Sequence, residues 1–599
     1  MPKIGARALL PMLATASIVS VELLLSGPPL LALAAPTYIV DSNLDAHKDG
    51  AFPAMDCRST LTPDHPCTLR AAIESANNAA SRAAIDVPGN LVITLDATLG
   101  ELNPNVPMSI ASTGGGGAVV DGGLQTRVFH TTDATTGVTM SGLTVRHGKP
   151  APGQDHTGGG IGNEGTLTLN NVVVTLNEAK NAAGIADAGT LTINGGTVNG
   201  NTATADPASG DKSVAGGLGV TSGGVVVVSG TSFANNRADF GGGIATFGTT
   251  VLRSVAVTDN LATLVGGGLV AGIRSSNPDV GPADVTITDS TIRGNMAGGL
   301  GAGIFLGAGQ LGMSGSTVSG NEASGGSGGG MFVTSSSASL TNDTLSGNVA
   351  AQGGGGIAQE TFNPQAATQG GVVGMSLPGP SGLVPDQKGK SSLLTKASER
   401  RGRPAGLNAG ADDVTLGWVT LAGNSAQTGG GILNGASLSF TAHDTIVAGN
   451  AGAVKANCSG SVTSGGHNLQ SASDCGFGAT GDRSNSDPKL GGLANNGGPT
   501  QTRALQAGSA AIDGGGPCPP PASDQRGVRR PQGAECDIGA FESTAPIPAP
   551  PLTGGGPPAF CDPKDFDRGM IACLTDRNGP GSKMARQPAY EEEAIRLGR

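Results

Sequence analysis

Several groups of charged residues in this 599-residue chain could do chemistry on a substrate. Asp155 and His156 are adjacent, and a carboxylate beside an imidazole can exchange a proton with a bound molecule. The segment Gly466-His467-Asn468 holds another histidine, which we interpret as a hydrogen-bonded loop residue. Asp155-His156 is therefore the best candidate for a catalytic pair, and two ordinary surface residues are the default interpretation.

The densest set of charged residues lies near the C-terminus. It comprises Asp513, Asp524, Arg526, Arg529 and Asp537. Opposite charges at this density favour an ion-paired cap at the end of a fold, with a binding or catalytic site as the alternative.

An acidic loop near the N-terminus could hold a metal ion. Its carboxylates are Asp41, Asp45, Asp49 and Asp56. Carboxylate oxygens are the ligands that calcium prefers, so calcium is a possible cofactor, although a solvated loop is the default. We expect no other cofactor, because the glycine runs recur too regularly to be phosphate-binding loops.

Enzymes that cleave polysaccharides gather carboxylates on one surface, either to hold calcium or to act as acid and base. The carboxylates of the central region are instead scattered along the sequence. They are Asp155, Glu164, Glu178, Asp187, Asp239, Asp259, Asp289, Glu322 and Asp343. The sequence therefore predicts no catalytic residues, unless carboxylates converge only in three dimensions.

The eight cysteines fall into four couples that are close in sequence. The couples are Cys57 with Cys67, Cys458 with Cys475, Cys518 with Cys536, and Cys561 with Cys573. Metal binding is the alternative, but the sequence has no CxxC pair and no histidine at ligand spacing beside a couple. We therefore predict disulfides, which are typical of exported proteins.

The elements that must position these residues come from a repeat between residues 158 and 455. Each unit has a glycine-rich step into an aliphatic residue, as in Gly241-Gly242-Gly243-Ile244, followed 16 to 19 residues later by an asparagine. The asparagines are Asn177, Asn201, Asn236, Asn260, Asn295, Asn321, Asn348, Asn424 and Asn450. Two independent features share one period of 24 to 27 residues, lengthened at three places, so the unit is structural.

Short alternating runs such as 285–288 and 414–416 lie between these two features and predict two or three strands in each period. A unit this small must stack on its neighbours to bury its apolar face. The sequence therefore predicts an all-β fold, a right-handed parallel β-helix that resembles pectate lyases in architecture. We expect the asparagines to form a hydrogen-bonded ladder and the glycines to allow positive-φ corners.

The composition agrees with a thin core. The chain has 102 glycines and 37 prolines but only 13 phenylalanines, 2 tyrosines and 1 tryptophan. Its net charge of −11 makes nucleic acid an unexpected partner, because phosphate binding needs a basic face.

The first residues have the pattern of an export signal. Lys3 and Arg7 precede an apolar stretch, and small residues at 32–34 suit cleavage before Ala35. We expect no transmembrane segment after this cleavage and a secreted or cell-surface location.

Two segments carry a family resemblance. Residues 67–73, with an upstream cysteine, resemble the CSLREA domain of bacterial exported proteins, although Ala71 replaces the glutamate of that motif. Its helical pattern of Leu69, Ile73 and Ala76 suits a short capping helix. Residues 487–490, 496–500, 508–513, 524–527 and 536–542 together resemble the choice-of-anchor Q domain. The central repeats are similar to those of polymorphic outer-membrane and adhesin-like proteins. The resemblance implies export and a β-helix but no known reaction.

The predicted organisation has eight parts. They are a signal peptide (1–34), a CSLREA-like N-terminal cap (35–82), first β-helix coils (83–157), β-helix repeats (158–362), a basic insertion (363–412), last coils (413–480), a choice-of-anchor Q-like C-terminal module (481–543), and a Pro/Gly linker with a polar tail (544–599).

These features favour a non-catalytic protein that is adhesin-like or glycan-binding and structural, with an extracellular glycan or a surface protein as its partner. The alternative is a lyase or glycoside hydrolase that acts on an acidic polysaccharide in a groove of the β-helix. Three carboxylates that meet in one open groove would favour the enzyme.

Overall fold

The computed structural model describes residues 35–53, 56–79, 82–132, 137–152, 155–205, 212–273, 281–361, 413–435, 438–518 and 521–544. The described residues up to Glu542 belong to one compact unit. The predicted signal peptide, the basic insertion, the tail beyond residue 544, and the couple Cys561 with Cys573 lie outside the described residues. Within those ranges, no helix is long and apolar enough to cross a membrane.

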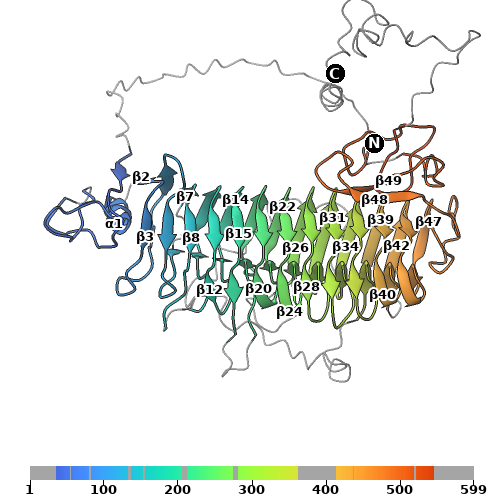
Figure 1. The fold of residues 1–599 in the computed structure, drawn as a ribbon, viewed down its shortest axis with the longest axis horizontal. Helices are drawn as coiled ribbons and strands as arrows, with labels where there is room; N and C mark the ends of the chain where they lie inside the picture. The colour runs from blue at the N-terminus through green and yellow to red at the C-terminus, as the bar shows by residue number, and fades with distance from the viewer. Residues whose placement is uncertain are drawn as a thin grey trace, which may run out of the picture. The chain divides into compact units, whose positions relative to one another are not determined.

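The chain coils repeatedly through four sheets in a fixed order (Figure 1). One coil runs through β9 (Ile161–Asn163), β10 (Thr166–Asn170), β11 (Val173–Thr175) and β12 (Glu178–Ala179). The next strand, β13 (Ile185–Asp187), pairs in parallel with β9 and so begins the next coil. Equivalent strands of successive coils therefore stack into parallel sheets, about 4.8 Å apart.

We number the four sheets in the order in which a coil passes through them from β10. Sheet 1 has 14 strands: β1 (Thr37–Ile39), β2 (Ala83–Pro88), β4 (Met108–Thr113), β7 (Gly137–Ser141), β10, β14 (Thr190–Asn194), β18 (Val225–Ser229), β22 (Thr249–Arg253), β26 (Ala283–Thr288), β30 (Gly309–Ser314), β34 (Ser336–Thr341), β38 (Asp413–Gly417), β42 (Ser439–His443) and β46 (Thr463–Gly466). Sheet 2 has 13 strands: β3 (Val92–Thr94), β5 (Val119–Asp121), β8 (Thr144–Arg146), β11, β15 (Thr197–Asn199), β19 (Ser232–Ala234), β23 (Ala256–Thr258), β27 (Thr291–Arg293), β31 (Thr317–Ser319), β35 (Thr344–Ser346), β39 (Thr420–Ala422), β43 (Ile446–Ala448) and β47 (Leu469–Gln470).

Sheet 3 has 9 strands: β12, β16 (Thr202–Ala203), β20 (Arg237–Phe240), β24 (Leu261–Val265), β28 (Met296–Ala297), β32 (Glu322–Ala323), β36 (Val349–Ala350), β40 (Ser425–Thr428) and β44 (Ala451–Val454). Sheet 4 has 11 strands: β6 (Phe129–Thr131), β9, β13, β17 (Leu218–Val220), β21 (Ile244–Thr246), β25 (Leu269–Ala271), β29 (Ile304–Leu306), β33 (Met331–Val333), β37 (Ile357–Gln359), β41 (Ile432–Asn434) and β45 (Cys458–Ser459). A separate antiparallel hairpin joins β48 (Leu490–Ala494) and β49 (Thr502–Leu505).

The core is a column of aliphatic side chains inside the coils. In β10 the buried residues are Leu167 and Leu169, and they stack in register on Leu191 and Ile193 of β14. The residues between them point outward, as period-two alternation requires. These stacks confirm the predicted parallel β-helix and explain why so few aromatic residues are enough to fill the core.

Each full coil of the repeat has four strands, so the prediction of two or three was wrong for these coils. Most of the extra strands lie in sheet 3, where β12 and β16 have only two residues each. A two-residue strand leaves no alternation in the sequence, which is why the pattern missed it.

The nine predicted asparagines lie in one buried row at the turn between sheets 2 and 3. Each of the first eight donates from Nδ2 to Oδ1 of the next asparagine at 2.9–3.0 Å. The backbone N–H of Asn236 also donates to Oδ1 of Asn260, and Nδ2 of Asn236 also donates to the carbonyl of Val198. The row continues beyond Asn450, which donates to Asn457, a residue that the period does not reveal.

The glycines of the repeat serve two different needs. Gly241 has a φ of 66°, as the prediction of positive-φ corners requires. Gly243 has no positive φ, but a Cβ there would lie 2.6 Å from the carbonyl oxygen of Gly268 and 3.0 Å from Nδ2 of Asn260. The glycine before each aliphatic residue is therefore needed because the next coil and the asparagine row approach it closely.

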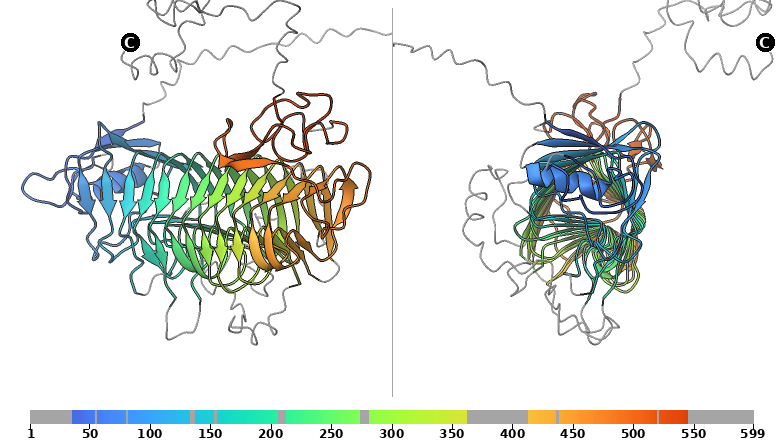
Figure 2. Two further views of the ribbon diagram at one scale, coloured as in Figure 1. Left: turned by 45° about the vertical axis from the view of Figure 1, so that its right-hand side comes forward. Right: turned by 90° about the vertical axis from the view of Figure 1, so that its left-hand side faces the viewer.

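A short helix caps the N-terminal end of the coils, as predicted. Helix α1 (Leu69–Ala79) lies across this end of the coils (Figure 2). Its residues Leu69, Ile73 and Ala76 are buried in the core. The Arg70 guanidinium donates two hydrogen bonds of 2.8 Å to the Asp45 carboxylate.

A disulfide between Cys57 and Cys67 precedes this helix, and a second joins Cys458 and Cys475 near the last coils. The third, between Cys518 and Cys536, lies in the C-terminal module. These three predicted couples are disulfides.

Candidate functional site

The C-terminal module (residues 481–542) folds back onto the outer face of sheet 2 (Figure 1). The amide of Gln525 marks this contact. Its Nε2 donates to the Thr317 and Thr500 hydroxyls at 3.0 and 2.9 Å, and its Oε1 accepts from the Thr344 hydroxyl at 2.6 Å. Gln525 is fully buried, so these hydrogen bonds form away from water.

Further contacts extend this interface along the last strands of sheet 2. The Thr500 hydroxyl donates to the Gly315 carbonyl at 2.7 Å, Nε of Arg503 donates to the Ser346 hydroxyl at 2.9 Å, and the Thr420 hydroxyl accepts from a backbone N–H of the module. Apolar side chains continue the contact over β43, where Ile446 packs in one cluster with residues of the module. The module thus covers β31, β35, β39 and β43.

The charged set predicted near the C-terminus lies inside this module. Asp524 forms an ion pair of 2.7 Å with Arg526, and Asp537 accepts a hydrogen bond from the backbone N–H of Asp513. Arg529 is exposed and lies apart from these carboxylates. The arrangement agrees with the cap interpretation.

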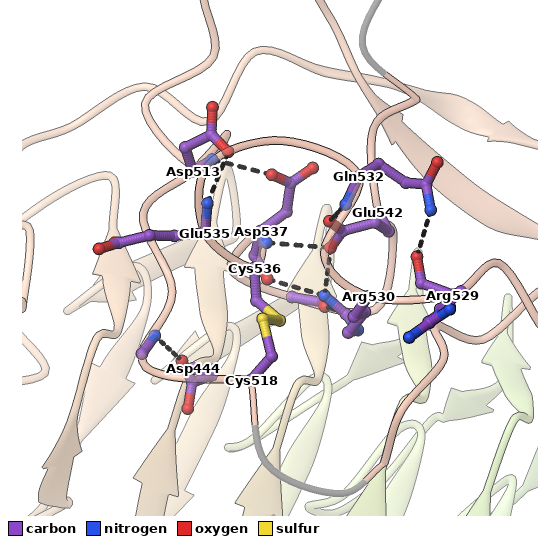
Figure 3. The surroundings of a disulfide bond; sticks show 12 residues. Asp444, Asp513, Cys518, Arg529, Arg530, Gln532, Glu535, Cys536, Asp537 and Glu542 are labelled. Carbon is purple, nitrogen blue, oxygen red and sulfur yellow. Dashed lines mark hydrogen bonds and ion pairs between the residues drawn. A yellow bond between two sulfur atoms is a disulfide. The ribbon is translucent and has the colours of Figure 1, made fainter.

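The most deeply buried ion pair of the module is one that the sequence analysis missed. Arg530 and Glu542 lie 2.9 Å apart with fully buried side chains, beside the disulfide between Cys518 and Cys536 (Figure 3). Burial lowers the pKa of Arg530, although the nearby carboxylates oppose this shift. A pair without solvent access fits a structural role, because a substrate could not reach it.

The other half of sheet 2 is uncovered. We call the outward positions of β8, β11, β15, β19, β23 and β27 the open face. In each of these strands the middle residue is buried and its two neighbours are partly or fully exposed, whereas all three residues are buried in β31, β35, β39 and β43.

Hydroxyl groups dominate the open face. Four successive strands each contribute one outward hydroxyl. They are Thr197 of β15, Ser232 of β19, Thr258 of β23 and Thr291 of β27. Their hydroxyls form no hydrogen bond with any residue that the structure describes. The open face therefore presents unused donors and acceptors on a lattice with the strand spacing of about 4.8 Å.

A hollow of ≈ 400 Å³ lies where the open face meets the C-terminal module. Its floor includes Thr291 and Arg293 of β27, and its wall is the loop from Asn495 to Gln501. This volume falls in the range of small-ligand sites, so it is the candidate binding site on this face.

Comparisons with known proteins bear on this architecture. A family model described as a right handed beta helix region matches residues 157–350. The chain is a right-handed parallel β-helix. No curated protein matches it.

Two solved structures are similar in fold. Pectate lyase Pel9A is 12% identical, with 85% of this chain and 97% of that chain covered and a TM-score of 0.33. The A-module of mannuronan C-5 epimerase AlgE6 from Azotobacter vinelandii is 17% identical, with 66% of this chain and 94% of that chain covered and a TM-score of 0.37.

A second group of charged residues lies beside β8, the first strand of the open face, around Asp121 of β5. The Asp121 carboxylate lies 2.7 Å from Nε of Arg146 and 3.1 Å from Nδ1 of His147. Burial raises the pKa of Asp121, but hydrogen bonds from the Gly123 N–H, Arg146 and His147 outweigh it and hold this pKa below its usual value. Asp121 therefore stays ionised and can orient the half-exposed His147.

A third group gathers at the start of sheet 4, around Arg127. This buried arginine contacts both Glu101, at 3.2 Å, and Asp155. His130 lies between two carboxylates, with Nδ1 2.9 Å from Glu101 and Nε2 3.1 Å from Glu164. The adjoining cavity is only ≈ 10 Å³, room for about one water molecule.

The pKa values in this third group follow from its pairing. Burial raises the pKa of Glu101, but the hydrogen bond from His130 and the charge of Arg127 outweigh it and leave the pKa below its usual value. Burial lowers the pKa of His130, but hydrogen bonds to Glu101 and Glu164 outweigh it and leave that pKa raised. The three carboxylates thus meet around Arg127 and His130 in a nearly closed space, and not in an open groove.

The predicted pair Asp155-His156 is divided by the structure. Asp155 belongs to the third group, whereas the described contact of His156 is through its carbonyl, which accepts from the backbone of Lys180 and Asn181. The partners Glu101 and Arg127 come from earlier coils, so no local motif could have revealed this group.

The acidic loop does not converge on one point. Asp45 pairs with Arg70, while Asp41 accepts from the Cys67 N–H and Asp49 from the Ala51 N–H. Across the described ranges, no three His, Cys, Asp or Glu residues are arranged to hold a metal ion.

Proposed function

We propose that this protein is an exported, non-catalytic β-helix protein that binds an extracellular glycan along the open face. The observation that carries the proposal is the continuity of sheet 2. On its covered half the hydroxyls of Thr317, Thr344 and Thr420 hydrogen-bond to polar groups laid across the strands. On its open half, Thr197 and Thr291 hold equivalent register positions with unused hydroxyls.

A glycan suits this surface because its own hydroxyls can donate to and accept from such a lattice. The outward residues of β15, β19 and β23 are threonine, serine, asparagine and alanine, without an aromatic side chain. The centre of a protein–protein interface is usually rich in aromatic residues, which makes a protein partner less suited to the open face. Each contact is weak, so affinity comes from many contacts made at once.

The absence of catalysis is part of the proposal. The carboxylates around Arg127 are paired with Arg127 and His130 beside a cavity too small for a sugar. In the C-terminal module, Asp524 and Glu542 are held in ion pairs with Arg526 and Arg530. Both groups have structural roles that account for their charges.

Export is supported by the three disulfides, which persist in oxidising compartments. The apolar N-terminal segment with its small residues before Ala35 supports the same location. We therefore place the protein outside the cell or on its surface, where glycans are abundant.

One observation favours a second candidate, a lyase or hydrolase that acts on an acidic polysaccharide. Asp121 holds His147 by its Nδ1 beside the open face, which leaves Nε2 available as a proton acceptor. Arg146 beside it could neutralise a substrate carboxylate. This group lies beside β8, the first strand of the open face, where a bound glycan could reach it.

Incubation of the purified protein with a panel of neutral and acidic polysaccharides tests both candidates. Retention of a glycan without new chain ends supports the binding function. New chain ends that disappear in the His147→Ala variant would establish the enzyme instead. If the protein neither retained a glycan nor produced new chain ends, both candidates would be rejected.

A further inference from the structure

The hollow at the boundary between the open face and the C-terminal module has a distinct chemistry. Elsewhere the open face is mostly neutral, but Arg293 lines the hollow with an exposed guanidinium. Arg293 forms no ion pair and no side-chain hydrogen bond with any described residue. An arginine that lines a hollow and has no carboxylate partner among the described residues is available to bind an anion.

A second arginine strengthens the positive field on this side of the face. Arg293, Ser319 and Ser346 occupy one register position on successive strands. Arg503 of the C-terminal module donates to the Ser346 hydroxyl, and no described carboxylate pairs with it. Ser346 lies two strand spacings, about 10 Å, from Arg293. The charge of Arg503 therefore adds to the attraction of an anion toward the hollow at physiological ionic strength.

Two aspartates also stand near Arg293 and offset part of its positive field. Asp259 and Asp289 stand at turns before and beside β27, and Oδ1 of Asp259 would lie 2.4 Å from a Cβ on Gly294. Neither aspartate lines the hollow, and neither forms an ion pair with Arg293.

The remaining groups that line the hollow suit sugar hydroxyls. Asn495 uses its Oδ1 to accept from the Gly497 N–H, which leaves its Nδ2 to donate. The side chains of Gln501 and Thr291 make no described hydrogen bond. Thr500, in contrast, is already engaged, because its hydroxyl bonds to the Gly315 carbonyl and to Gln525.

We propose that this hollow binds a carboxylated sugar unit, a uronic acid, of the glycan that lies on the open face. The guanidinium of Arg293 holds the sugar carboxylate with two parallel hydrogen bonds, and Thr291, Asn495 and Gln501 bind the hydroxyls of the ring. A single carboxylate matches the single arginine within the hollow. This inference rests on the proposed glycan binding and adds the class of sugar.

The test compares hexasaccharides of galacturonic acid with the same hexasaccharides after methyl esterification of their carboxyls, by calorimetric titration of the full protein. We expect the acid to bind at least about tenfold more tightly than the ester, with a preference that weakens as salt rises. Arg293→Gln should abolish this preference and leave ester binding unchanged. Arg253→Gln, which alters an exposed and unpaired arginine at the end of β22 in sheet 1, should change neither.

Equal binding of the acid and the ester by the unaltered protein would overturn the inference and leave glycan binding on the open face intact. An acid preference that survives Arg293→Gln would also overturn it, because the carboxylate would then be bound elsewhere. If a sulfated hexasaccharide bound more tightly than the uronic acid, the group that the hollow prefers would be a sulfate and not a carboxylate. Failure to bind any saccharide would reject the proposed function itself.

Discussion

The Thr344 hydroxyl donates to Oε1 of Gln525 at 2.6 Å, although 181 residues separate them in the chain. Thr344 belongs to β35 in sheet 2, and Gln525 belongs to the C-terminal module. The hydrogen bond is buried, and the other end of the same amide binds Thr317 and Thr500. The module is therefore fitted to sheet 2 by specific polar contacts, and where it ends the open face begins.

Replacement of Gln525 should loosen the module. Gln525→Ala leaves the buried Thr344 hydroxyl without its partner and removes one of the hydrogen bonds of Thr317, at a cost of about 2–3 kcal/mol. The module should become sensitive to limited proteolysis while the coils remain protected. Gln532→Ala, at an exposed position of the same module, should behave like the unaltered protein. Equal protease resistance of both variants would contradict this role of Gln525.

The asparagine row should be costly to interrupt. Asn260→Ala leaves the backbone N–H of Asn236 without its buried acceptor and removes one hydrogen bond each from Nδ2 of Asn236 and Oδ1 of Asn295, which should lower the free energy of unfolding by about 3 kcal/mol. The exposed pair of Asn194 with Asn170 has the same 2.9 Å geometry, so Asn194→Ala is a matched control and should cost under about 0.5 kcal/mol. Thermal unfolding of the two variants gives the comparison. Similar losses of stability in both would show that burial of the row does not set the cost of interrupting it.

The third glycine of each repeat step should tolerate no side chain. In Gly243→Ala the new Cβ would lie 2.6 Å from the Gly268 carbonyl oxygen, so the coils must separate locally, at a cost of about 2 kcal/mol or more. Gly312→Ala in β30 has open space around the new Cβ and should be neutral or slightly stabilising. If Gly243→Ala unfolds at the same temperature as the unaltered protein, the close approach of the coils is not a constraint.

Asp187 should make stability depend on pH. Burial raises the pKa of this carboxyl to about 7, against the hydrogen bond from Asn163, and its Oδ2 has no partner among the described residues. The folded protein therefore holds a proton that the unfolded chain loses near pH 4, and stability falls as pH rises from about 4 through 7.

The loss should be on the order of 3 kcal/mol between pH 4 and pH 8. Asp187→Asn removes the titrating group and keeps an oxygen for Asn163, so its unfolding temperature should fall less over this interval. The measurement is thermal unfolding of both proteins at several pH values in one buffer series. Parallel curves for the two proteins would mean that Asp187 is not the group responsible.

The coiled fold was predictable because its cause is repeated. Every coil must place a small residue beside the next coil and an amide in the buried row, so Gly243 and Asn260 leave the same trace as their equivalents in the other coils. Helix α1 was predictable for a similar reason, since Leu69 and Ile73 share one helical face.

The surface sites were not predictable in the same way. Thr317 and Thr197 look alike in sequence and in register, yet the module covers one and leaves the other open. That difference arises from a segment about 200 residues away, which carries no local signal. The group of Glu101, Arg127 and His130 likewise forms only because separate coils stack.

Glycan retention by two triple variants tests the central claim most directly. The first removes hydroxyls from the open face, by Thr197→Val, Ser232→Ala and Thr258→Val. The second makes similar changes at outward positions of sheet 1, by Thr168→Val, Thr192→Val and Thr286→Val. The structure predicts that the first variant loses at least about tenfold in glycan affinity while the second binds like the unaltered protein. Equal affinity in both variants would contradict the assignment of glycan binding to the open face.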